Sequence, residues 1–161
     1  MTGSKVLSVL VVHPEAETRR ALVETLRLAL PGAALHTSEA STPTQALQAA
    51  SWLDPKVVLL DLIAERRLAL DVARTLRRPG RWILGLYNPL IAADRGAELF
   101  RAGARAGVTD YIALPASEAE LAAALSALES SASESRRDGR AAGRAGSRCG
   151  KKRRETAIGS S

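Results

Sequence analysis

Five strand-like runs, each followed by a segment with helical spacing, constrain the fold of this chain more than any other feature. Val6–Val12 and Val57–Leu60 are largely apolar at both odd and even positions, which is typical of strands buried on both faces of a sheet. The other expected strands are residues 33–37, 82–86 and 108–113. This alternation predicts an α/β fold with a five-stranded parallel sheet, doubly wound in the flavodoxin-like manner.

The helices expected between the strands carry recognisable end signals. Ser117 and Glu120 have the spacing of a capping box at the start of the last helix. In the helix before it, Ala93, Ala97 and Phe100 are expected to lie in line on the inward face. The expected helices cover residues 17–30, 43–53, 68–77, 92–102 and 117–128.

The distribution of charge separates the chain into two parts. Residues 131–161 hold nine Lys/Arg and three Asp/Glu, a balance of +6 that equals the net charge of the whole chain. Residues 1–130 are therefore neutral overall and are expected to form the folded domain. Residues 131–161 are rich in Ser, Gly and Arg and poor in large apolar residues, so they are expected to form a disordered basic tail.

Composition gives three further expectations, which concern a basic run, the single cysteine and the location. Lys151–Arg154 can contact nucleic acid or an anionic membrane weakly by charge alone, with a purely solvated extension as the alternative. Cys149 is the single cysteine, so neither an internal disulfide nor a cysteine metal site is expected. No signal peptide or membrane-spanning run is visible, and a cytoplasmic location is expected.

Three motifs point to a family. The stretches "VLSVLVVHPEAETRRALVETL", "VVLLDL" and "AGVTDYIALP" resemble the receiver domain of bacterial two-component response regulators. The resemblance covers roughly residues 5 to 129 and implies a (βα)5 receiver fold. It also implies a switch in which an aspartate takes a phosphoryl group from the histidine of a sensor kinase, with Mg²⁺ held beside it.

The resemblance places the phospho-acceptor at Asp61. Without it, a strand-end carboxylate that caps the next turn is the ordinary interpretation. His13 and Pro14 stand where the family carries its two acidic Mg²⁺ ligands, with Glu15 directly after them. Proline has no ligand atom and Mg²⁺ prefers oxygen to imidazole nitrogen, so any Mg²⁺ site here is reduced to Asp61 and Glu15. The other interpretation of Glu15 is an exposed acid in the first turn of the helix.

Three further positions carry the family's switch. Tyr87 takes the place of the Ser/Thr after the fourth strand, and Tyr111 matches the aromatic residue of the fifth strand. Leu114 replaces the lysine that pairs with the phosphoryl oxygens. The missing cation favours a degenerate receiver, or pseudo-receiver, that is not an enzyme and acts through protein–protein contacts.

Two alternatives stay open. The chain is then either a conventional receiver phosphorylated on Asp61 by a partner histidine kinase, or a small flavodoxin-like enzyme or nucleotide-binding domain. The last is disfavoured because "VVHPEAET" has no glycine to make a phosphate loop. The expected partners are a sensor kinase, a downstream signalling protein, or a second copy paired through residues 92–102, 108–113 and the helix from Ser117.

Overall fold

The computed structural model describes residues 6–145, with only the backbone for Ala132 and residues 135–145. The chain divides into two units, residues 1–128 and 129–161. The strands lie in the first unit and are β1 (Val6–Val12), β2 (Ala34–Ala40), β3 (Val57–Asp61), β4 (Trp82–Tyr87) and β5 (Asp110–Ala113). The helices are α1 (Ala16–Ala29), α2 (Pro43–Leu53), α3 (Arg66–Leu76), α4 (Pro89–Ala92), α5 (Gly96–Ala106) and α6 (Glu118–Ala145).

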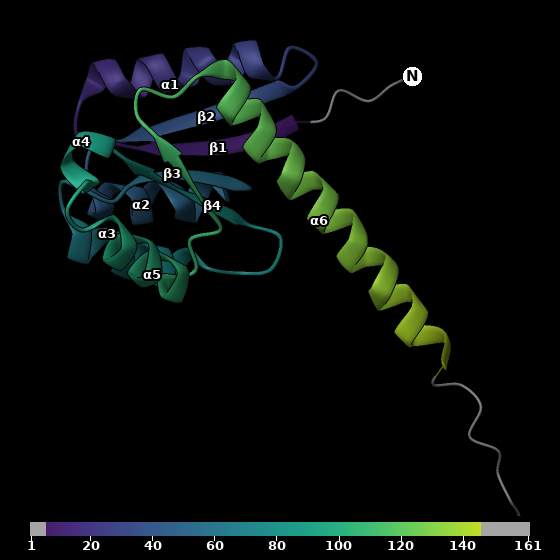
Figure 1. The fold of residues 1–161 in the computed structure, drawn as a ribbon. Helices are drawn as coiled ribbons and strands as arrows, with labels where there is room; N and C mark the ends of the chain where they lie inside the picture. The colour runs from purple at the N-terminus through teal and green to yellow at the C-terminus, as the bar shows by residue number, and fades with distance from the viewer. Residues whose placement is uncertain (1–5, 146–161) are drawn as a thin grey trace, which may run out of the picture. The chain divides into compact units, whose positions relative to one another are not determined.

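The strands form one parallel sheet in the order β2-β1-β3-β4-β5 (Figure 1). Val12 pairs with Leu60, and Leu60 pairs with Gly85, so β1, β3 and β4 end at the same edge. This is the doubly wound order that places chemistry at the carboxyl ends of the strands. The predicted fold class is therefore confirmed.

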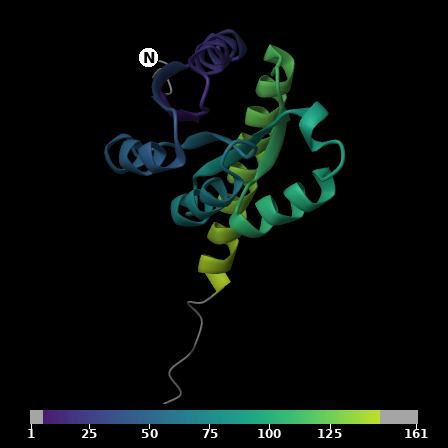
Figure 2. The ribbon, with the colours of Figure 1, turned by 90° about the vertical axis from the view of Figure 1, so that its left-hand side faces the viewer.

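Helices cover both faces of the sheet (Figures 1 and 2). On one face, Leu10, Val58 and Ile83 pack with buried residues of α2, α3 and α5. On the other face, Val11 and Leu59 pack with buried residues of α1 and the first turns of α6. Successive strand residues thus enter opposite cores, which explains why these strands are apolar at every position.

The expected capping box at the start of α6 is confirmed. The backbone N–H of Ser117 donates to Glu120 Oε2 at 3.1 Å, and the N–H of Glu120 donates to Ser117 Oγ at 3.2 Å. At the start of α2, Thr42 Oγ1 accepts from the N–H of Gln45 at 3.2 Å, and Pro43 occupies the first turn. Each side chain satisfies a backbone donor that a helix start leaves without an internal partner.

The helix expected over residues 92–102 is wrong in position. The structure has a short α4, capped by Asn88 whose side chain accepts from the N–H of Leu90, followed by α5. Ala93 and Ala97 are exposed and Phe100 is half-buried, whereas the buried residues of α5 are Leu99, Gly103 and Ala106. The alanine spacing misled because Asn88-Pro89 starts a separate turn, which changes the phase of the helix that follows.

The end of the last helix also differs from the sequence expectation. Residues 131–145 were expected to be disordered, whereas α6 is helical to Ala145. Alanine and arginine favour helix, and these preferences outweigh the lack of large apolar residues here. The remainder of the expected tail, with Cys149 and Lys151–Arg154, lies outside the described residues. Within the described part of the chain, no helix is long and apolar enough to cross a membrane.

Candidate functional site

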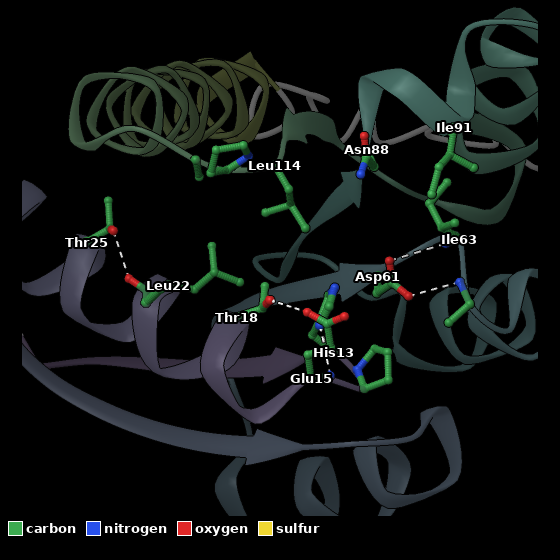
Figure 3. A pocket seen from close by; sticks show the side chains of 15 residues that line it. His13, Glu15, Thr18, Leu22, Thr25, Asp61, Ile63, Asn88, Ile91 and Leu114 are labelled. Atoms are coloured by element: carbon green, nitrogen blue, oxygen red, sulfur yellow. Dashed lines mark hydrogen bonds between the residues drawn. The ribbon is translucent and has the colours of Figure 1, made fainter.

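A pocket opens at the carboxyl edge of the sheet, where the ends of β1, β3 and β4 meet the turn after β5 (Figure 3). It has a volume of about 450 Å³ and is lined by 15 residues. His13, Pro14, Glu15, Asp61 and Leu114 are all among them. The structure therefore brings five of the seven sequence-predicted positions into one site.

Asp61 is the last residue of β3, and only 8% of its surface is exposed. Its Oδ1 accepts from the N–H of Ile63 at 3.3 Å, and its Oδ2 accepts from the N–H of Ala64 at 3.0 Å. The carboxylate thus caps the turn after β3 and also faces the pocket. The two roles are compatible, because each carboxylate oxygen can accept more than one hydrogen bond.

The segment His13-Pro14-Glu15 connects β1 to α1. His13 Nδ1 accepts from the N–H of Glu15 at 3.1 Å, which leaves the Nε2 side of the imidazole for the pocket. Glu15 is the N-cap residue of α1 and is exposed, and its Oε2 accepts from Thr18 Oγ1 at 3.0 Å. Pro14 contributes an apolar ring to the pocket wall.

Arg19, which sequence reasoning missed, positions this segment. Its Nη1 donates to the carbonyl of His13 at 2.7 Å and to that of Pro14 at 3.2 Å. Its Nε donates to Glu39 Oε1 at 3.2 Å, and 16% of its side chain is exposed. The guanidinium therefore ties the β1–α1 connection to the end of β2 and does not line the pocket.

Tyr87 and Tyr111 lie away from the pocket and share Phe100 as a neighbour. The ring centroids of Tyr87 and Phe100 are 5.2 Å apart, and those of Phe100 and Tyr111 are 4.6 Å apart, both edge to face. Tyr111 Oη donates to the carbonyl of Phe100 at 2.6 Å. Burial raises the pKa of Tyr111, so the hydroxyl keeps its proton and remains a donor.

Two glycines make room for the Tyr111 ring. A methyl group at Gly85 would lie 3.0 Å from Tyr111 Cδ1, and one at Gly103 would overlap the Tyr111 hydroxyl. The ring is therefore held inward by a hydrogen bond on one side and by close backbone on the other.

Asn88 is the polar residue that the pocket receives from the end of β4, although the sequence pointed to Tyr87. Asn88 Oδ1 accepts from the N–H of Leu90 at 3.0 Å, and Figure 3 shows the amide nitrogen turned toward the pocket. Directly after the neighbouring strand β5, the N–H of Leu114 donates to the carbonyl of Tyr87 at 2.8 Å, and the Leu114 side chain enters the pocket. Successive side chains of a strand point to opposite sides, so the exact residue at which β4 ends decides whether Tyr87 or Asn88 faces the pocket. The spacing of residues in the sequence does not predict a strand end to within one residue.

The side chains at this edge do not fit Mg²⁺. Within the described residues, no three His, Cys, Asp or Glu side chains gather as a metal site. Asp61 and Glu15 are the two carboxylates among the lining residues, fewer than the near-octahedral oxygen coordination of Mg²⁺ demands. Neither Pro14 nor Leu114 adds an oxygen ligand.

Comparison with solved structures supports the fold. A response regulator from Thermotoga maritima matches with a TM-score of 0.61 at 20% identity, over 78% of this chain and 98% of that one. The chemotaxis response regulator CheY4 of Vibrio cholerae matches with a TM-score of 0.61 at 18% identity, over 77% of this chain and 99% of that one. At these identities the likeness shows the fold alone.

Curated relatives decide the family. The DNA-binding response regulator MtrA of Mycobacterium tuberculosis is 33% identical over 119 residues, which are 74% of this chain and 49% of that protein. MtrA of Mycobacterium leprae gives the same identity and coverage. This chain carries a response-regulator receiver domain. The chain spans about half the length of these relatives, and no protein-family model matches it.

The pocket lies at the carboxyl edge of the sheet of this receiver domain. The resemblance in the sequence places the family's acceptor at Asp61, its lysine at Leu114 and its acidic pair at His13-Pro14, and all four residues line this pocket.

Proposed function

We propose that this receiver domain is a degenerate signalling module of a two-component pathway in the cytoplasm, which acts through protein–protein contacts rather than phosphorylation of Asp61. The pocket carries the proposal, because none of its 15 lining residues is Lys or Arg. A phosphoryl group on Asp61 would bring roughly two negative charges beside the Glu15 carboxylate. With no cation to stabilise that charge in the transition state, phosphoryl transfer is slow.

The packing of Tyr111 supports the same proposal. The family resemblance implies that this aromatic residue turns with phosphorylation. Here the Tyr111 ring is confined by Gly85 and Gly103, and its hydroxyl is bonded to Phe100. A domain that presents one fixed surface fits a partner without a phosphorylation step. We propose that the module acts by binding and is not an enzyme.

The deciding experiment is incubation of the whole chain with acetyl phosphate and Mg²⁺, followed by intact mass. We expect no added phosphate, with a receiver domain that carries the acidic pair and the lysine as the positive control. The alternative is a conventional receiver phosphorylated by a histidine kinase, which the position of Asp61 on the pocket favours. One added phosphate that disappears in Asp61→Asn would establish that alternative and end the degenerate interpretation.

The proposed contact surface is formed by α5, β5 and the first turn of α6, for a sensor kinase, a downstream protein or a second copy. Arg95, Arg101 and Glu118 are exposed there. Glu98, in contrast, lies 3.6 Å from Arg66 of α3 and is already paired. Arg95→Glu with Arg101→Glu should weaken self-association or partner capture without changing the melting temperature, because exposed charges set association more than stability.

The matched control for this surface is Arg27→Glu on α1, whose side chain is 62% exposed and belongs to another face. We expect Arg27→Glu to leave association unchanged. Equal loss of binding in both variants would show a general charge effect and count against a specific surface.

A further inference from the structure

The pocket at the carboxyl edge has more space and more apolar wall than phosphate chemistry requires. Its volume of about 450 Å³ falls within the usual range of small-molecule sites, roughly 300–1,000 Å³. Nine of its 15 lining residues are apolar, among them Leu22, Ile63, Ile91 and Leu114. They come from α1, the β3–α3 loop, α4 and the turn after β5, so the apolar wall surrounds the pocket on several sides.

The charge of the pocket selects among possible ligands. Glu15 and Asp61 both line it, whereas Lys and Arg are absent from its described lining. Arg19 is the neighbouring cation, and it donates to two backbone carbonyls and to Glu39 instead. The two carboxylates therefore make the electrostatic potential inside the pocket negative, and a negative potential repels a free anion and attracts a cation.

The hydrogen-bonding capacity points the same way. Asp61 Oδ1 and Oδ2 each accept one backbone N–H, and Glu15 Oε2 accepts one hydroxyl. Carboxylate oxygens have about four acceptor sites in all, so both groups keep sites for a further donor. An ammonium group offers three N–H donors and suits two such acceptors.

We propose that this pocket binds a small organic cation with a primary amine at one end and an apolar body of about one aromatic ring. The amine is placed at the Glu15 and Asp61 side, and the apolar body lies against Ile63, Ile91 and Leu114. Ile91 is 62% exposed, and its neighbour Leu90 is 89% exposed, so apolar surface continues outward from the mouth of the pocket. The proposal goes beyond the signalling role, and binding is measured directly whether or not Asp61 is phosphorylated.

The test uses the whole chain, labelled with ¹⁵N, and three probes with one apolar body. These are 4-phenylbutylamine, neutral 4-phenylbutanol and anionic 4-phenylbutanoate. We expect saturable amide shifts for the amine, confined to the non-proline residues of 13–18, 61–64, 88–91 and 114–116, with a Kd on the order of 1 mM for so small a ligand. The alcohol should bind at least about threefold more weakly, and the carboxylate should not saturate, because an exposed charge pair contributes only a few-fold in affinity.

Variants separate the pocket from general charge effects. Glu15 is exposed, so Glu15→Gln should not disturb folding, and it should lower the affinity for the amine about three- to fivefold. Glu17→Gln, exposed on the same helix but outside the pocket, should not change it. Leu114→Lys should abolish amine binding and admit 4-phenylbutanoate. Equal affinity for all three probes, or shifts spread over the surface, would overturn the proposal, as would equal effects of Glu15→Gln and Glu17→Gln.

Discussion

At the scale of single residues, the proposed loss of phosphorylation depends most on Leu114. The resemblance in the sequence places the family's lysine at Leu114, and Leu114 lines the same pocket as Asp61. Reinstating the charges with Leu114→Lys, His13→Asp and Pro14→Asp should allow Asp61 to be phosphorylated by acetyl phosphate with Mg²⁺, because a cation and two oxygen ligands are then beside the acceptor.

Intact mass measures this gain, and Asp61→Asn in the same background should remove it. Leu114→Met with the same two aspartates is the matched control, since methionine keeps the volume and adds no charge. A phosphate gained equally by the Lys and Met versions would show that the cation is unnecessary, which contradicts the argument.

Tyr111 offers a second test at this scale. Tyr111→Phe removes the hydrogen bond from Oη to the Phe100 carbonyl, which should cost about 1 kcal/mol and lower the melting temperature by a few degrees. Tyr87→Phe is the control, because the Tyr87 ring makes an edge contact with Phe100 that phenylalanine preserves. Thermal denaturation that shows equal losses in the two variants would refute a special role for the Tyr111 hydroxyl.

Much of the site was predictable from the sequence, because parallel strands end at one edge and the residues after them meet there. His13, Glu15, Asp61 and Leu114 do line one pocket. Asn88 and Arg19 were not predictable. The position of Asn88 depends on the exact residue at which β4 ends. The role of Arg19 depends on the path of its side chain, which donates to the carbonyl of His13 and to Glu39.

At the scale of elements, the contact between α5 and β5 is unusually close. Alanine in place of glycine within a helix normally stabilises by about 1 kcal/mol. At Gly103 the opposite sign is expected, because the new methyl group would overlap the Tyr111 hydroxyl and overpacking costs roughly 1–3 kcal/mol. Gly103→Ala should therefore lower the melting temperature.

Gly96→Ala is the control on the same helix, since its methyl group would meet Phe100 at an ordinary 3.7 Å. It should leave the melting temperature unchanged or raise it. A Gly103→Ala protein as stable as Gly96→Ala would mean that Tyr111 moves aside freely, and that its inward position is not enforced.

A second element-scale link lies at the amino edge of the sheet. Asp54 follows α2 in the left-handed conformation, with φ 49°, and its carboxylate pairs with Arg78 and, at 2.8 Å, with Arg81. Arg81 also donates to the carbonyls of Pro55 and Leu76, each at 2.9 Å. One side-chain cluster thus joins the ends of α2 and α3 to the start of β4.

The pH dependence of stability should report this cluster. The hydrogen bond from Arg78 lowers the pKa of Asp54 below its usual 3.8, so Asp54 stabilises the fold above that pH and ceases to do so as pH falls through its folded pKa. Asp54→Asn should lower the melting temperature at pH 7, and the difference from the parent should shrink below about pH 4. Asp71→Asn, which breaks the exposed pair with Arg74, should have little effect. A pH-independent difference for Asp54→Asn would exclude the carboxylate as the cause.

The presence of five strands and their places along the chain followed from apolar patterning, but three other features of the helices and strands did not. β2 runs to Ala40 through the polar stretch His36–Glu39, because pairing with β1 along its full length overrides weak strand preference. The split between α4 and α5 depends on the Asn88 cap. The helical state of residues 131–145 depends on the helix preference of the residues themselves and not on burial in a core. Hydrophobic periodicity reports burial, and each of these features is set by hydrogen bonding or backbone preference instead.

At the scale of the whole molecule, core and charge are segregated along the sequence. Leu121, Leu125 and Leu128 of α6 belong to the core, while the excess of six positive charges lies after residue 130. The neutral part is therefore expected to fold without the basic part, and any weak contact with nucleic acid or anionic membranes belongs to residues 131–161 and should fall steeply with salt.

A chain ended after residue 130 should keep its melting temperature within about 2 °C of the full chain, because a loss of only ~1 kcal/mol would move a domain of this size by several degrees. A chain ended after residue 124 is the control, since it removes Leu125 and Leu128 from the core and should melt much lower. Scanning calorimetry compares the three chains, and binding of a short DNA duplex at low salt should disappear in both truncations. A melting temperature that drops in the chain ended at 130 would show that the basic segment is part of the folded domain. DNA binding that persists in that chain would show that the neutral body carries the binding surface, because all six excess positive charges lie after residue 130.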